Sequence, residues 1–84
     1  MNRYDHQFAA TCPSDGVTVI YHLTIKSDVT IMAEDIVKAC QFEGPKYHEA
    51  MADELITKLG GWQTIRATHQ GVHIKTKRSH DALG

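Results

Sequence analysis

The sequence predicts an α+β domain in which a four-stranded antiparallel sheet carries two helices on one face. Apolar and polar residues alternate near both ends of the chain, whereas apolar residues in the middle recur at helical spacing. The predicted order is strand, strand, helix, helix, strand, strand (ββααββ), which a single sheet covered on one face satisfies. The 84 residues suffice for one small domain, which we place at residues 1–78, followed by a flexible tail at 79–84.

The first hairpin is predicted at residues 4–12 and 17–26, because apolar and polar side chains alternate along both segments. Between them, residues 13–16 read Pro-Ser-Asp-Gly, which is typical turn chemistry. Alternation along the second strand places five apolar side chains on the face that the helices would cover: Val17, Val19, Tyr21, Leu23 and Ile25.

Two helices are predicted between the hairpins. Residues 27–28 (Ser-Asp) can cap the first, whose apolar side chains recur at helical spacing over 29–40. Pro45 is suited to the first position of the second helix, which we expect to span 45–59. Glycines at 60–61 end that helix, since glycine readily adopts the left-handed conformation found there. Its apolar stripe comprises Tyr47, Met51, Ala52, Leu55, Ile56 and Leu59.

A second hairpin is predicted at 62–69 and 72–77, around a turn at 70–71. The face of the sheet away from the helices would be polar, with Thr18, His22, Thr24, Lys26, Arg66, His73, Lys75 and Lys77. Such a face is solvated in a monomer and could line the interior of an oligomeric barrel. Sheets that bind RNA usually carry aromatic residues for stacking, which this face almost lacks, so we expect no nucleic-acid partner.

Composition sets further limits on function. The net charge of −1 gives no global sign of a nucleic-acid binder, and no apolar run approaches the ~20 residues of a membrane span. The two cysteines are too few for a disulfide framework, so we expect reduced thiols in a cytoplasmic protein. The six histidines match no common zinc signature, and we expect neither a metal nor a cofactor.

Two short motifs carry potential chemistry. Cys12 and Asp15 stand where the first strand enters its turn, and His48 and Glu49 stand in the first turns of the second helix. A thiol, an imidazole and carboxylates are the ingredients of covalent catalysis or of purine-like recognition. Each also has a simpler interpretation, because free cysteines are often buried and acids near a helix start complement the helix dipole.

The predicted order of elements resembles that of the tunnelling fold, which includes GTP cyclohydrolase I, dihydroneopterin aldolase and 7-cyano-7-deazaguanine reductase. Four segments resemble the reductase in the same order: 8–16 (FAATCPSDG), 47–49 (YHE), the amphipathic helix 50–59, and 71–74 (GVHI). Together they cover most of residues 8–77.

This resemblance implies roles for three residues, Cys12, His48 and Glu49, whereas the proton-donating aspartate of the reductase has no clear counterpart. Cys12 matches the thiol that adds to the substrate nitrile, and Asp15 is a nearby candidate for the proton donor. Glu49 matches the carboxylate that anchors the heterocycle, and His48 matches a histidine of the substrate pocket. The implied partners are a small heterocyclic ligand and further copies of the chain in a homo-oligomer, because fold members commonly build their pockets between subunits.

Two departures from the reductase leave the function open. The Gly-Gln-Pro-Asp segment that follows its Cys-Pro is absent here, and residues 32–36 read Met-Ala-Glu-Asp-Ile in place of the Glu-Ser-Lys-Ser signature linked to NADPH. One hypothesis is a small enzyme that binds a deazapurine- or pterin-like heterocycle, with Cys12 as nucleophile. The alternative is a non-catalytic binding or interaction module that retains the fold without the chemistry.

Overall fold

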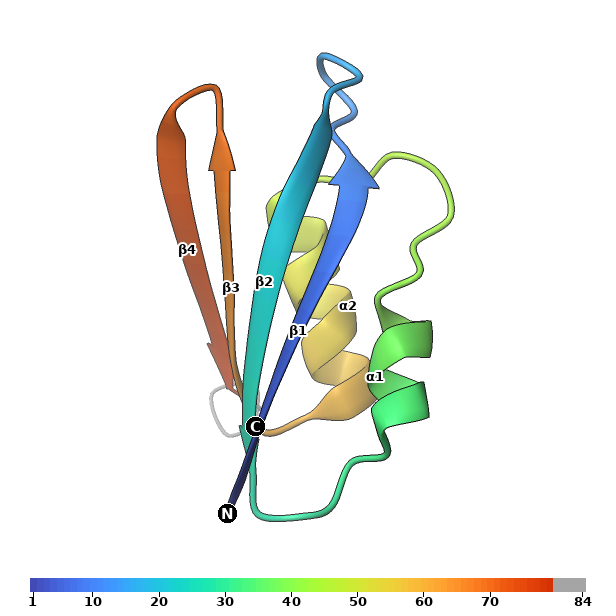
Figure 1. Ribbon diagram of the computed structural model, residues 1–84, viewed down its shortest axis with the longest axis vertical. Coiled ribbons are helices and arrows are strands. Elements are labelled where there is room, and N and C mark those ends of the chain that lie inside the picture. The colour runs from blue at the N-terminus through green and yellow to red at the C-terminus, as the bar shows by residue number, and fades with distance from the viewer. Residues whose placement is uncertain (80–84) are drawn as a thin grey trace.

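The computed structural model describes residues 1–79 and confirms the α+β class and the ββααββ order. Its elements are β1 (Asn2–Thr11), β2 (Thr18–Ser27), α1 (Ala33–Ala39), α2 (His48–Leu59), β3 (Trp62–His69) and β4 (Val72–Ser79). The strands form one sheet in the order β1-β2-β3-β4, and each neighbouring pair is antiparallel. Both helices cover the same face of this sheet (Figure 1). Apart from Ser79, the expected tail lies outside the described residues.

The core lies between this sheet and α2. Alternate residues of β2 from Val19 to Ile25 are buried, as the periodicity predicts, whereas Val17 precedes the strand and is exposed. Leu55 of α2 is completely buried against them. Burying a side chain of this size stabilises the fold by about 1.5–3 kcal/mol. No helix among residues 1–79 is long and apolar enough to cross a membrane.

Both helices begin later than the sequence indicates. Ser27 belongs to β2, and its hydroxyl donates to the carbonyl of Val29 at 2.9 Å and accepts that residue's N–H at 3.1 Å. It therefore forms a local turn instead of a helix cap. Similarly, Pro45 does not start α2, because the N–H of Lys46 bonds to the carbonyl of Thr11 at 3.2 Å and holds this segment against β1.

One end of the sheet gathers residues that are distant in sequence. Because the strands follow one another in antiparallel order, the β1–β2 and β3–β4 turns lie at the same end (Figure 1). The bond between Lys46 and Thr11 brings the start of α2 to this end as well. The candidate residues of both sequence motifs come from segments that meet here.

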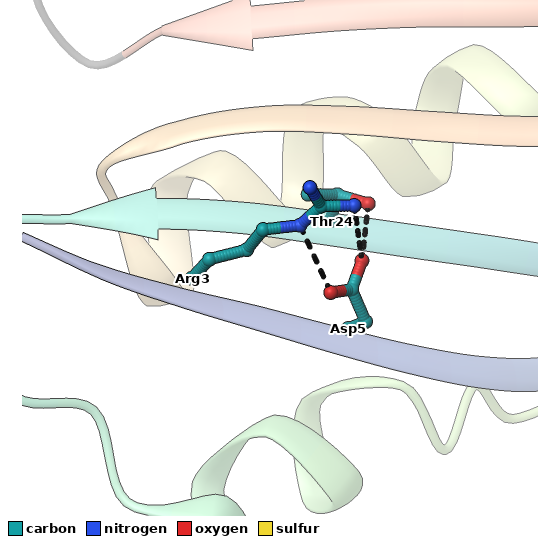
Figure 2. A network of polar contacts seen from close by, with 3 residues as sticks. All are labelled: Arg3, Asp5 and Thr24. Carbon is teal, nitrogen blue, oxygen red and sulfur yellow. Dashed lines mark hydrogen bonds and ion pairs between the residues drawn. The ribbon is translucent and has the colours of Figure 1, made fainter.

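The opposite face of the sheet, hereafter the open face, is polar and mostly basic. Asp5 accepts hydrogen bonds from Thr24 Oγ1 at 2.7 Å and from Arg3 Nε at 3.0 Å (Figure 2). The Thr24 bond links β2 to β1, whereas the Arg3–Asp5 ion pair lies within β1 and, being exposed, adds little stability. They lower the pKa of Asp5, with the Thr24 bond contributing most.

Candidate functional site

Two hollows are candidates for a site. The larger, about 680 Å³, lies on the open face, where His22, Arg66, His73 and Lys75 contribute to it. The smaller, about 240 Å³, lies at the end of the sheet where the two hairpin turns meet, and we call it the hairpin-end pocket. Its lining consists of Cys12, Ser14, Val19, Tyr21, Tyr47, His48, Ala67, His69 and Ile74. We take it as the candidate site, because it combines a thiol with two imidazoles in a mostly apolar hollow.

The β1–β2 turn fixes the backbone of Cys12. Its N–H bonds to the carbonyl of Val17 at 2.9 Å, and its carbonyl accepts the N–H of Gly16 at 3.0 Å. Gly16 has a φ of 73°, a conformation that glycine adopts without steric strain. The Cys12 thiol is half-buried and lies 3.2 Å from the hydroxyl of Ser14. It is thus held in place at the wall of the pocket.

Asp15 lies beside the pocket and accepts several hydrogen bonds. Its Oδ1 accepts the N–H of Val17 at 3.0 Å, and its Oδ2 accepts Gln70 Nε2 at 2.8 Å. The same Oδ2 lies 2.8 Å from Nε2 of His69. These contacts, the Val17 N–H above all, lower the pKa of Asp15 to about 2. The group is ionised at neutral pH, which suits a hydrogen-bond acceptor better than the proton donor for which Asp15 was a candidate.

His69, the last residue of β3 before the β3–β4 turn, also lines the pocket and was not predicted as a site residue. Gln70 and Gly71 form the turn with φ values of 51° and 78°, as in the tight two-residue turns of hairpins. A positive φ is uncommon for a residue other than glycine, and the side chain of Gln70 is the one that reaches Asp15. Cys12, Asp15 and His69 each offer one atom that could bind a metal ion, and these three atoms lie within 4.8 Å of one another.

His48 begins α2 and lines the same pocket. Its ring packs edge-on against Tyr21, with the ring centroids 5.4 Å apart. Both ring nitrogens are buried and have no hydrogen-bond partner among residues 1–79. Burial lowers the pKa of His48; the backbone of Ile65 opposes this shift, although its approach falls short of a hydrogen bond. Buried ring nitrogens with unused hydrogen-bonding capacity require explanation, and a ligand is one.

Glu49 lies differently from its neighbour. Successive helical residues are rotated by about 100°, so that His48 faces the sheet while Glu49 is exposed. In the described part of the chain, Glu49 is not among the residues that line the hairpin-end pocket. A single chain therefore brings Cys12 and His48 to one pocket but leaves Glu49 outside it.

Comparisons with protein families, curated proteins and solved structures find no match to this chain.

Proposed function

We propose that the chain binds a flat heterocycle of the deazapurine or pterin class in the hairpin-end pocket. The observation that carries this proposal is the position of Cys12 and His48 around one small hollow, with Tyr21 and Tyr47 as further walls. Its volume of about 240 Å³ is below the range of about 300–1,000 Å³ that is usual for drug-sized ligands. A single fused ring system suits such a space, and the tunnelling-fold resemblance supports the chemical class.

His48 and Cys12 would have different roles in the pocket. The imidazole of His48 would exchange a hydrogen bond with the edge of the ring, which would satisfy a nitrogen that lacks a partner. The thiolate of Cys12 would add to an electrophilic carbon such as that of a nitrile. This addition forms one S–C bond, and the displaced π-electron pair moves to the nitrile nitrogen, which takes a proton from water.

Glu49 would bind the heterocycle in a pocket that two copies of the chain form together. Because its side chain is exposed in one copy, it would anchor the heterocycle at a pocket completed by the neighbouring copy. The outer edges of β1 and β4 have no strand partner among residues 1–79, and unpaired edges are natural surfaces for association. The proposed functional unit is therefore a homo-oligomer.

The second candidate is a binding module without catalysis. The ionised state of Asp15 favours it, because a carboxyl group with a pKa of about 2 supplies no proton to an adduct at neutral pH. In this case the pocket would bind the heterocycle reversibly, and the Cys12 thiol would remain unmodified.

A titration followed by NMR tests the binding. We expect 7-cyano-7-deazaguanine or a pterin to shift the amide resonances of Cys12 and His48 together. His48→Asn and Glu49→Gln should weaken binding, whereas Cys12→Ala should retain binding and lose any adduct seen by mass spectrometry. His73→Gln, on the open face, is the matched control. If His48→Asn and Glu49→Ala both bind as tightly as the parent, the proposed site is wrong.

Light scattering tests the oligomer separately. A strict monomer at high protein concentration would remove the role of Glu49. Binding through Cys12 and His48 would then be judged by the titration alone.

A further inference from the structure

We infer that Cys12, Asp15 and His69 form a binding site for a zinc ion at the hairpin end of the sheet. Cys12 and Asp15 come from the connection between β1 and β2 and His69 from the adjoining end of β3, and one potential metal ligand atom of each lies within 4.8 Å of the other two. This inference does not rest on the heterocycle proposal. It concerns a side-chain cluster that extends from the pocket wall to Asp15.

The distances within the cluster suit a tetrahedral ion. Zinc binds sulfur at about 2.3 Å and imidazole nitrogen or carboxylate oxygen at about 2.0–2.2 Å, which separates two ligand atoms by about 3.3–3.7 Å. The pair formed by His69 Nε2 and Asp15 Oδ2, at 2.8 Å, would open slightly, and a separation at the 4.8 Å limit would close by about 1 Å. Such changes are within the reach of side-chain rotation at two turns.

The surroundings of Asp15 already orient it as a ligand. The N–H of Val17 holds one carboxylate oxygen at 3.0 Å, and the amide of Gln70 holds the other at 2.8 Å. Hydrogen bonds from outside the ligand shell are the usual means by which proteins orient metal-binding carboxylates. Gln70 provides its bond from a backbone with φ of 51°, an uncommon conformation for a residue other than glycine.

The arrangement differs from that of a catalytic triad built on the same residue types. In a triad, the imidazole lies between the nucleophile and the acid, so that each partner uses a different ring nitrogen. Here the carboxylate of Asp15 accepts a hydrogen bond from Gln70 and lies 2.8 Å from His69 Nε2, and the Cys12 sulfur lies within 4.8 Å of both ligand atoms. Three ligand atoms that lie mutually within 4.8 Å can bind one shared cation.

The ligand types select the ion. Thiolate and imidazole favour zinc over magnesium or calcium, which prefer oxygen ligands. Three protein ligands leave a fourth position for water or a bound molecule. Zinc binding and covalent addition are alternative uses of the Cys12 thiolate, because a thiolate held on the metal is not free to attack carbon.

The test is a titration of the reduced, metal-free full-length chain with zinc, followed by calorimetry. Cobalt serves as a spectroscopic probe, because a bound thiolate gives a sulfur-to-cobalt charge-transfer band in the near ultraviolet. We expect one ion per chain and that band in the parent. Cys12→Ser should abolish the band, and Asp15→Asn and His69→Gln should each weaken zinc binding about tenfold or more.

His73→Gln is the matched control, because it removes a histidine that lies just beyond the same turn on the open face. It should bind zinc like the parent. The inference is overturned if the parent takes up no zinc in molar excess, or if His69→Gln binds as tightly as His73→Gln. Circular dichroism of each variant without metal distinguishes loss of the site from loss of the fold.

Discussion

The side-chain amide of Gln63 donates a hydrogen bond of 2.8 Å to the carbonyl oxygen of Gly60, across the turn between α2 and β3. The same nitrogen donates to the carbonyl of Leu55 at 3.1 Å, and Gln63 is only 3% exposed. Backbone carbonyls at a helix C-terminus need donors from elsewhere. One buried polar side chain therefore fixes the end of α2 against the sheet.

Gln63→Leu should lower the free energy of unfolding by about 1–2 kcal/mol, because it removes the donor shared by the buried bond to Leu55 and the partly buried bond to Gly60. The substitution also removes Gln63 Oε1, which is buried and has no partner among residues 1–79, and this removal offsets part of the loss of stability. Urea denaturation measures the change. Gln7→Leu, on an exposed position of β1, is the control and should stay within about 0.5 kcal/mol of the parent. Equal stabilities of the two variants would show that the Gln63 bonds contribute nothing.

The glycine pair after α2 offers a matched comparison. Gly60 and Gly61 have φ values of 68° and 73°, but only at Gly61 would an added Cβ meet an atom within 4 Å, the carbonyl oxygen of Lys26 at 2.5 Å. Gly60→Ala should destabilise the fold by about 1–3 kcal/mol through backbone strain alone. Gly61→Ala should cost distinctly more, because β2 would have to move. Thermal unfolding curves of the two variants that coincide would contradict this prediction.

The two thiols should differ sharply in reactivity. Cys40 is buried, and burial raises its pKa to about 11, so that only about one thiol in a thousand is ionised at pH 8. Iodoacetamide should therefore modify the partly exposed Cys12 and spare Cys40 in the folded chain. Peptide mapping locates the label, Cys12→Ser should show none, and the denatured chain should be labelled at both positions. Labelling of Cys40 at the rate of Cys12 would mean that the core opens readily.

The fold was predictable because its main signals are local. Period-two alternation placed residues such as Val19 and Leu23 on the buried face, and helical spacing placed Leu55 opposite them. The helix starts were less predictable, because distant contacts decide them. Ser27 is taken up by β2, and the peptide after Pro45 is bound to Thr11 of β1.

The candidate site was predictable only in part. Cys12 and His48 do share a pocket, but His69 joins them through the strand order, which brings its turn beside Asp15. A motif of adjacent residues also cannot say by itself which one faces inward. The apolar stripe of the helix distinguishes the two residues, because His48 lies on the same helical face as Ala52 and Leu55, whereas Glu49 does not.

His48 should make stability depend on pH in a defined direction. Burial lowers its pKa below the ordinary 6.5, and the charge of Arg78 acts in the same sense, while Glu49 opposes it. The unfolded chain then binds more protons than the folded one, so the contribution of His48 is complete above about pH 6.5 and is lost as the pH falls through the lowered folded pKa.

Urea denaturation between about pH 5 and pH 8 follows this loss. His48→Phe should flatten that part of the curve and raise stability at the acid end, since it replaces two unpartnered nitrogens with an apolar ring against Tyr21. The control is His22→Phe, at an exposed position of the open face, which should keep the slope of the parent. If the His48 variant keeps that slope as well, then His48 is not the group that links protonation to unfolding.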